Sequence, residues 1–378
     1  MAKILVLGGS YLQSDFVDVA CAENHSVHVI DRNAKCYLST QKDIDFYKID
    51  IGNLADVDKF FIRHSFDMIV SPITEIGNKV SSQIARKHNL LYNSLDAVSA
   101  TTDKWLMRDA LKSTKLDEPK VLRLREGEKL EKLDIEFPFI VKPTVSSASR
   151  GVTKVKDLKE LHDAIERALP YCKTINNIIL EEFIEGEQFS IETITSKGKH
   201  HVLGIVREHL SGSPHFMERF DVLDKYYNFL VIDNIQSFVN ELLNALDIQY
   251  GPCHIEVKID EFLNVRLIEI ASRSGLLRDR LLRASGGENY NKLIIDTYLG
   301  NTIGKTELPT SNGCLGMVAY EDDLKCYNRA KKDNLITDSY FYPNYSFVKN
   351  PTMLTDVAGY FFIKSKDVSV FNKYKVRL

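Results

Sequence analysis

The sequence predicts a protein of mixed class, with an α/β unit at the N-terminus followed by α+β units. Residues 1 to about 100 alternate apolar strand patterns with helical patterns, which indicates a parallel sheet covered by helices. Two short strands, 254–260 and 265–273, are joined by a connector of hairpin length. The last 70 or so residues are rich in Tyr and Phe and also indicate strands.

Composition limits the classes of function. A chain of 378 residues is long enough for two or three domains. A formal charge of −3 gives no electrostatic footprint for nucleic acid or an anionic membrane. Six scattered cysteines without a CxxC pair predict reduced, buried thiols in a cytoplasmic protein. The pattern of a signal peptide and an apolar run of about 18 residues are both lacking, so no membrane partner is expected.

In the N-terminal unit we expect strands at 3–7, 26–30, 68–71 and 90–92, with helices such as 14–22 and 78–88 between them. Gly8, Gly9 and Ser10 follow the first strand and Asp31 follows the second, as in a dinucleotide-binding fold. Because the third glycine of that fingerprint is missing, we interpret the segment as a tight strand-to-helix turn. An NAD-dependent oxidoreductase remains the alternative.

A small-residue loop follows a strand that ends at Lys142 and Pro143. The loop contains Ser146, Ser147, Ser149 and Gly151, and a second strand is expected at 152–155. Small residues let backbone N–H groups approach phosphate oxygens closely, and a lysine offers them a point charge. The Walker A pattern is absent, and an ordinary hairpin is the alternative interpretation.

An apolar strand then runs into an acidic turn at 181–187 and a second strand. Exposed backbone groups at such a turn can hydrogen-bond an adenine edge, and a carboxylate just beyond can accept from ribose hydroxyls. A plain charged turn is the alternative.

The hairpin at 254–273 carries paired carboxylates. Residues two apart share a strand face, so His254, Glu256 and Lys258 point one way together. Glu256 and Glu269 are then expected to face one space from neighbouring strands. A hard divalent cation such as Mg²⁺ relieves the repulsion between two such carboxylates. A solvated acidic face is the alternative.

These motifs in this order resemble the ATP-grasp superfamily. They are a lysine at a helix start (Lys104), a lysine before a Ser/Gly loop, an EExxxGE turn, and an ExK…ExxxR strand pair. Within it the chain most resembles carboxylate–amine ligases of the L-amino-acid ligase type, with carbamoyl-phosphate-synthase-like proteins next. The resemblance covers residues 1 to about 300. It implies an ATP-grasp fold preceded by a Rossmann-like pre-ATP-grasp domain.

The domains implied are a pre-ATP-grasp domain at 1–100, a small lid subdomain at 101–185 and a large subdomain with the metal site at 186–305. Residues 306–378 are expected to form a cap or a dimer element. The resemblance also implies small-molecule carboxylate and amine substrates, a homodimer and a cytoplasmic location.

Site roles follow from the resemblance. Lys104 and Lys142 would contact ATP phosphates, the 146–151 loop would close over them as a lid, and Lys258 would also contact the nucleotide. Glu256 and Glu269 would bind Mg²⁺, or Mn²⁺ in its place. The turn residues would hold adenine, and Glu187 would bind ribose, although many relatives place this glutamate where Gln188 stands here. The turn residues are Glu181, Glu182, Phe183 and Ile184.

Catalytic roles are implied for Arg273, Arg207 and Lys142. Arg273 suits stabilisation of a carboxylate or acyl-phosphate, because its planar fork matches such oxygens. Arg207 stands where relatives place a cation near the reacting phosphate. His215 and Glu218 fall in a loop that often approaches substrate, with a solvated loop as the alternative.

Two departures from the family pattern concern the site. Ala271 replaces an Asn that many relatives use as a metal ligand, which puts a second metal ion in doubt, and Arg273-Ser-Gly-Leu276 replaces Arg-x-Gly-Gly. Three arginines follow, and a solvated basic helix face is their expected role, with recognition of an acidic substrate as the alternative. They are Arg278, Arg280 and Arg283.

The function implied is an ATP-dependent ligase that forms an amide through an acyl-phosphate and releases ADP and phosphate. Two alternatives remain besides the oxidoreductase. One is a bicarbonate-using enzyme of the same fold, and the other is a non-catalytic nucleotide-binding protein.

Overall fold

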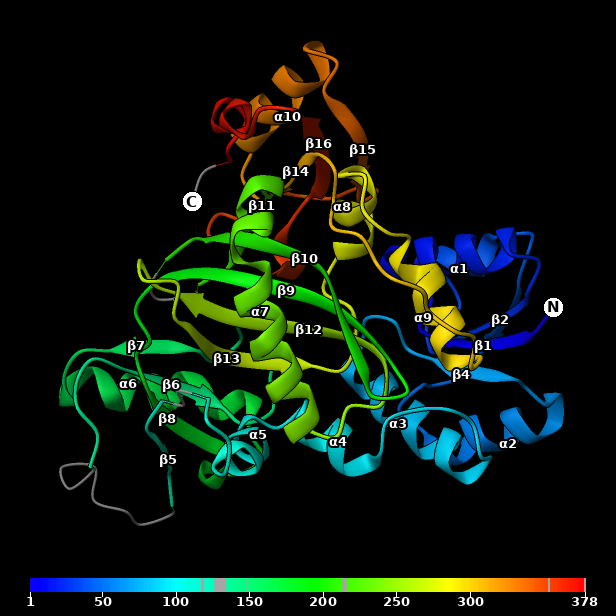
Figure 1. Cartoon of the computed structure of the whole chain (residues 1–378), viewed down its shortest axis with the longest axis horizontal. Coiled ribbons are helices and arrows are strands. Elements are labelled where there is room, and N and C mark those ends of the chain that lie inside the picture. The colour runs from blue at the N-terminus through cyan, green and yellow to red at the C-terminus, as the bar shows by residue number, and fades with distance from the viewer. Residues whose placement is uncertain (117–118, 126–133, 148, 213–215, 353, 377–378) are drawn as a thin grey trace.

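The computed structural model describes residues 1–116, 119–125, 134–147, 149–212, 216–352 and 354–376. Three sheets organise them, with helices on their faces (Figure 1). The first sheet is parallel and the other two are antiparallel, which confirms the predicted mixture of α/β and α+β structure.

The N-terminal sheet has the strand order β3-β2-β1-β4, with every pair parallel. Its two faces are covered separately, because alternate residues of β1 pack in different directions. Ile4 and Val6 pack with Phe16 of α1, whereas Leu5 and Leu7 pack with apolar residues of α2 and α3. The elements are β1 (Lys3–Leu7), α1 (Tyr11–Ala22), β2 (Ser26–Asp31), β3 (Asp45–Lys48), α2 (Leu54–His64), β4 (Met68–Val70) and α3 (Glu75–Lys87).

The glycine turn after β1 is stabilised by a side chain of the chain itself. The backbone N–H of Gly9 donates to the Asp31 carboxylate at 2.8 Å. The Ser10 hydroxyl caps α1 by accepting from the backbone N–H of Leu12. Asp31 therefore holds a tight strand-to-helix turn, as the sequence interpretation expects.

The prediction of a strand at 90–92 is wrong. This segment is irregular, and it packs against the central sheet instead of pairing with β4. The ring of Tyr92 stacks on Tyr298 at 4.8 Å between centroids, and its hydroxyl donates to Asn78 at 2.6 Å. Asn93 next bonds to the backbone of Tyr250. Tertiary contacts thus override the strand propensity of this short apolar run. Helix α4 (Leu95–Ala100) follows shortly after it.

A second, antiparallel sheet has the order β5-β8-β6-β7, with α6 packed against β6 and β7. Residues 126–133, between β5 and β6, lie outside the described part of the chain. The elements are α5 (Lys104–Leu111), β5 (Val121–Arg123), β6 (Phe139–Pro143), β7 (Thr153–Val155), α6 (Leu158–Ala168) and β8 (Ile178–Glu182).

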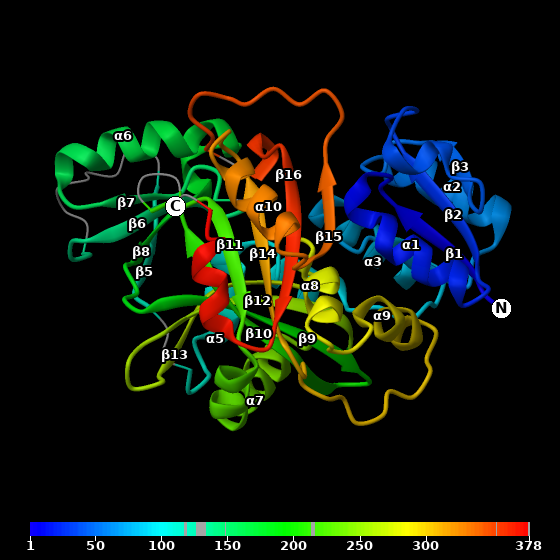
Figure 2. The same cartoon turned by 90° about the horizontal axis from the view of Figure 1, so that it is seen from above.

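The central sheet has eight strands in the order β13-β12-β9-β10-β11-β14-β16-β15. The C-terminal strands extend it, since β11 pairs with β14 (Figure 2). The strands are β9 (Glu187–Ser196), β10 (Lys199–Leu210), β11 (Glu218–Leu223), β12 (Tyr250–Ile259), β13 (Val265–Ala271), β14 (Asn312–Val318), β15 (Ile336–Phe341) and β16 (Gly359–Ser365).

Helices cover this sheet on both sides. The long helix α7 packs against β10, and α9 packs against β9 and β12. Asn289 caps α9 by accepting from the backbone N–H of Lys292. The helices are α7 (Lys225–Ala245), α8 (Arg278–Ala284), α9 (Tyr290–Tyr298), α10 (Asp323–Lys332) and a terminal 3₁₀ helix, η6 (Val368–Lys373).

All six cysteines are free, but only Cys253 and Cys314 are fully buried, so the expectation of buried thiols is partly wrong. Within the described ranges, no helix has both the length and the apolar character needed to cross a membrane.

Candidate active site

The paired carboxylates lie directly opposite each other. In the antiparallel pair β12–β13, Glu256 is the register partner of Glu269. His254 and Lys258 line the same cleft as Glu256, because they share its strand face. The predicted geometry of the hairpin is therefore confirmed.

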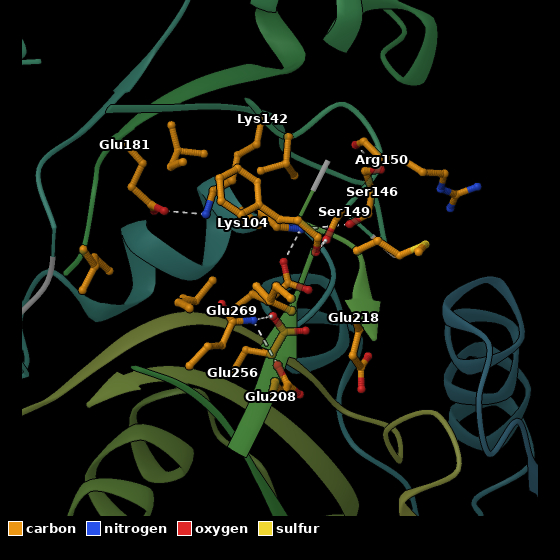
Figure 3. A pocket seen from close by; sticks show the side chains of 18 of the residues that line it. Lys104, Lys142, Ser146, Ser149, Arg150, Glu181, Glu208, Glu218, Glu256 and Glu269 are labelled. Atoms are coloured by element: carbon orange, nitrogen blue, oxygen red, sulfur yellow. Dashed lines mark hydrogen bonds and ion pairs between the residues drawn. The ribbon is translucent and has the colours of Figure 1, made fainter. Parts of the chain in front are cut away.

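The cleft lies between the β5-β8-β6-β7 sheet and the central sheet (Figure 3). Twelve of the residues expected from the sequence line it: Lys104, Lys142, Ser146, Ser149, Glu181, Glu182, Phe183, Ile184, Glu256, Lys258, Glu269 and Arg273. Segments from four parts of the chain thus meet at one place, as the order of motifs suggested.

Lys104 joins the two walls of the cleft. Asp103 caps α5, and the backbone N–H of Lys104 donates to Thr144 at 2.8 Å. The Lys104 ammonium donates to the carbonyl of Ser146 at 2.9 Å and lies 2.7 Å from a Glu269 oxygen. Burial alone would lower the pKa of Lys104, but Glu269 raises it, so this lysine stays charged.

Lys142 belongs to a buried ion group on the roof of the cleft. Its ammonium pairs with Glu181, whose other oxygen lies 2.7 Å from Arg108. Arg108 also donates to the carbonyl of Leu267 at 2.8 Å and so connects the roof to β13. Burial would raise the pKa of Glu181, but Arg108 and Lys142 lower it to about 2. The Glu181 carboxylate therefore orients Lys142, a role that the sequence did not predict.

The rest of the acidic turn presents its predicted residues to the cleft. Glu182 pairs with Arg266 at 3.0 Å, and Phe183 lies beneath the Lys154 ammonium, 3.3 Å from the ring centroid. Ile184 is buried. Gly186 has φ +120°, and a Cβ there would lie 2.8 Å from the carbonyl oxygen of Ile259, so the turn needs a glycine.

The serine-rich loop spans the cleft opening. The Ser146 hydroxyl donates to the carbonyl of Arg150 at 2.9 Å, and the Ser149 hydroxyl donates to Phe216 at 3.1 Å across the cleft. Ser147 lines a neighbouring wider cleft. Gly151 is absent from both linings; it adopts φ +75° behind the loop.

Arg207 and Glu187 are not brought to the cleft. They pair with each other at 3.3 Å on the opposite face of the central sheet, and Glu187 is largely exposed. Side chains alternate between faces along a strand, so their neighbours Glu208 and Gln188 line the cleft instead. The structure thus gives no support to the reacting-phosphate role of Arg207 or the ribose role of Glu187.

Sequence reasoning missed Gln188 and Glu208 as cleft residues. The Gln188 amide donates to Glu208 at 3.0 Å and to Glu256 at 3.3 Å. Polar residues alternate with apolar ones along β9, at 188, 190 and 192, and this signal could have found Gln188.

The three arginines after the hairpin all pair with carboxylates. Arg280 pairs with Asp338 at 2.6 Å and Arg283 with Asp15 at 2.5 Å, which joins α8 to β15 and α1. Arg278 is fully buried and contacts four carboxylates. Its partners are Glu208 and Glu218 at 2.7 Å, Asp221 at 2.8 Å and Glu192 at 3.4 Å. The expected solvated helix face is wrong for Arg278 and Arg280, whose side chains are enclosed by other elements, whereas the Arg283 side chain stays 45% exposed.

His254 supplies a second positive charge beneath the cleft. Its Nδ1 donates to Glu192 at 2.6 Å, and its Nε2 lies 3.5 Å from Glu256. Burial would lower the pKa of His254, but Glu192 and Glu256 raise it to about 10, so the ring is an imidazolium at neutral pH. Glu218 lines the cleft as expected, whereas His215 lies outside the described residues.

Because of the Glu208 carboxyl group, the free energy of unfolding should fall as pH rises. Burial and the nearby Glu218 and Glu256 raise its pKa to about 7, because Arg278 is shared among four carboxylates. Between about pH 4.5 and 7 the folded chain then holds a proton that the unfolded chain has lost. Over this interval the free energy of unfolding of the wild type should fall by up to about 3 kcal/mol. We expect this fall to be absent in Glu208→Gln.

Urea unfolding of the wild type and the variant between pH 4.5 and 8 measures this effect. The exposed Glu166→Gln serves as the control and should leave the pH dependence unchanged. Parallel stability curves for the wild type and Glu208→Gln would refute the prediction.

A wider cleft adjoins the first one. It lies between the N-terminal domain, the serine-rich loop and the C-terminal strands, and both clefts share Arg150 and Arg273. Arg273 pairs with Glu75 of α3 at 3.3 Å. The remaining charged and tyrosine side chains of its wall are Asp31, Arg32, Asp50, Tyr342, Tyr345 and Tyr360.

The donor set fits a hard divalent ion. Glu256 and Glu269 offer carboxylate oxygens to one space, and the methyl group of Ala271 adds no donor. Among the residues that the structure describes, no three His, Cys, Asp or Glu side chains are grouped to hold an ion. The chain thus offers part of a coordination sphere, which suits Mg²⁺ because this ion usually keeps water and phosphate ligands.

Comparison with known proteins identifies the fold of the site. Residues 135–276, from just before β6 to just beyond Arg273, match the ATP-grasp domain family. The chain contains an ATP-grasp domain. Both strands of the carboxylate hairpin and the roof of the cleft lie within it.

Curated relatives of the ATP-grasp domain include two kinds of enzyme. Formate-dependent phosphoribosylglycinamide formyltransferase of Bacteroides fragilis is 28% identical over 203 residues, covering 52% of each chain. D-alanine–D-alanine ligase of Haemophilus influenzae is 28% identical over 177 residues, covering 42% of this chain and 54% of the relative. The chain spans about half the length of the curated relatives it matches.

Solved structures share the fold outside the ATP-grasp domain as well. The L-amino acid ligase from Bacillus licheniformis has a TM-score of 0.83 at 19% identity, covering 99% of this chain and 96% of that one. N5-carboxyaminoimidazole synthetase from Staphylococcus aureus, complexed with ADP, has a TM-score of 0.78 at 14% identity, covering 99% and 97%. At these identities the likeness confirms the fold, including the parallel N-terminal sheet.

Proposed function

We propose that the chain is an ATP-dependent carboxylate–amine ligase, which makes an amide through an acyl-phosphate and releases ADP and phosphate. The observation that carries the proposal is the pair of Glu256 and Glu269, opposed on neighbouring strands beside Lys104 and Lys142 in one cleft. Two similar proteins are named as amino-acid ligases, which supports this reaction over other uses of the fold.

In the first step a substrate carboxylate oxygen attacks the γ-phosphorus of ATP in line, and ADP leaves. Lys104 and Lys142 are proposed to bind the phosphates, and the acidic turn to hold adenine. Glu256 and Glu269 would hold Mg²⁺, or Mn²⁺, which when bound neutralises charge on the phosphate oxygens. The loop containing Ser146 and Ser149 is the proposed lid that excludes water.

In the second step the amine nitrogen attacks the acyl carbon, loses a proton and displaces phosphate. Arg273 is proposed to bind the carboxylate or acyl-phosphate oxygens with its planar fork, because it faces both clefts. The wider cleft would receive the acceptor substrate. Its wall carries Arg32 and Arg150 together with Asp31 and Asp50, and this mixture of signs suits a zwitterionic amino acid.

ADP release with Mg-ATP across a matrix of amino acids, other carboxylates, amines and bicarbonate tests the proposal. We expect release that requires both a carboxylate and an amine. Release with bicarbonate alone would move the protein to the carboxylating branch of the fold. ATP binding without turnover on any pair would favour the non-catalytic alternative. The proposed cytoplasmic location and homodimer stay predictions of the sequence.

A further inference from the structure

A second cavity lies on the face of the central sheet opposite the cleft. It is bounded by β9, β10 and β11, the start of α7, and η6, the red helix beside β11 in Figure 2. Along β9 and β10, Gln188 and Glu208 line the cleft, whereas Phe189, Arg207 and His209 line this cavity. The two cavities are therefore separated by the thickness of the sheet.

The cavity gathers positive charge. Two cations, Arg207 and Lys375, line it together with His209. Burial and the charge of Lys375 lower the pKa of His209, which favours its neutral form. In the described part of the chain, neither His209 nor Lys375 has an acidic side chain within ion-pair distance, and the partner of Arg207 is the largely exposed Glu187. Burial, followed by the charge of Arg207, lowers the pKa of Lys375. Lys375 is thus a cation without an acidic partner, and an anion bound beside it would relieve its repulsion from Arg207.

The carboxylate in the cavity wall, that of Asp224, already accepts hydrogen bonds. Asp224 caps α7, and one of its oxygens accepts from the backbone N–H groups of Tyr226 and Tyr227 at 2.9 and 3.4 Å. His209 Nδ1 donates to the carbonyl of Phe220 at 3.0 Å, which leaves Nε2 for another partner. None of these hydrogen bonds involves the Lys375 ammonium group.

Beside these charges the walls are flat and apolar. The rings of Phe189 and Tyr227 stack at 4.9 Å with an interplanar angle of 7°. The guanidinium carbon of Arg207 lies 5.3 and 5.5 Å from their centroids. Phe220 and Phe371 also belong to the apolar wall. A ligand with an anionic group and a flat apolar body would satisfy both features.

We propose that this cavity binds a small aromatic anion, with the carboxylate or phosphate against Lys375 and Arg207 and the ring against the apolar wall. The site is separate from the catalytic cleft and does not depend on the proposed ligase reaction.

Calorimetric titration of the full chain with benzoate and with phenyl phosphate tests the proposal, in the presence of saturating Mg-ADP to fill the cleft. We expect at least one probe to bind, and Lys375→Gln to weaken it by about tenfold or more, the loss of a charge-assisted contact. Lys373→Gln is the matched control, because Lys373 is exposed two residues away on the same segment. It should bind the probe like the wild type.

Several outcomes would overturn the proposal. They are no binding of either probe, equal binding by Lys375→Gln, an equal loss in Lys373→Gln, and equally tight binding of neutral benzamide. Benzoate binding alone would assign a carboxylate ligand, and phenyl phosphate binding alone would assign a phosphate.

Discussion

Glu269→Gln is expected to reduce ADP formation by at least about 10²- to 10³-fold while the chain stays folded. The substitution removes the charge of one of the two opposed carboxylates and the ion pair with Lys104 at 2.7 Å. Fewer charges would then hold the proposed metal ion, and the lysine would lose its anchor. ADP release with the carboxylate and amine that the matrix assay identifies measures the loss of activity. The far-ultraviolet circular dichroism spectrum shows whether the variant stays folded.

Glu261→Gln is the control for this prediction. Glu261 is exposed in the turn of the same hairpin, between β12 and β13, so its substitution changes the net charge by the same amount outside the cleft. We expect normal turnover in this variant. If Glu269→Gln kept full turnover, the proposed metal site would be wrong even if the ligase activity itself were real.

Arg278→Met should destabilise the chain by roughly 3–5 kcal/mol, because it leaves buried carboxylates without their counter-ion. Arg278 is fully buried and contacts Glu208, Glu218, Asp221 and Glu192 through its three nitrogens. Methionine fills similar space but neutralises none of these acids. The loss of stability should shrink as pH falls, because protonation of these carboxylates removes the repulsion among them.

Urea unfolding at pH 5 and pH 8 measures the loss. Arg278→Lys keeps the charge with fewer directed hydrogen bonds and should lose less stability than Arg278→Met. Arg86→Met, at an exposed position of α3, is the control and should be near neutral. A stability loss below about 1 kcal/mol in Arg278→Met would show that the carboxylates are already protonated in the folded chain.

The hairpin register and the order of the cleft motifs could be read from the sequence. Local alternation placed Glu256 opposite Glu269, whereas the resemblance to the ATP-grasp superfamily placed Lys104 in the same site. The hairpin register depends on residues close in sequence, where strand periodicity and connector length act directly. The parallel N-terminal sheet was predictable for the same reason, since its β1, β2 and β4 patterns are strongly apolar.

Three features were decided by the tertiary structure alone. Arg207 faces away from the cleft, because the position of β10 in the sheet fixes which alternate side chains face which side. No strand forms at 90–92, because Tyr92 stacks on Tyr298 and the neighbouring Asn93 bonds to Tyr250 of β12. The C-terminal strands complete the central sheet through β14.

The sequence by itself therefore determined the local elements and the residues that carry the chemistry. The tertiary structure decided which polar residues face the cleft and which charges become buried. The clearest case is Arg278, which belongs to a short basic segment of the sequence but is enclosed by acids from β9, β10 and β11. Burial and pairing of charges depend on residues far apart in the chain, and no local pattern encodes the low-polarity surroundings that give those charges their effect.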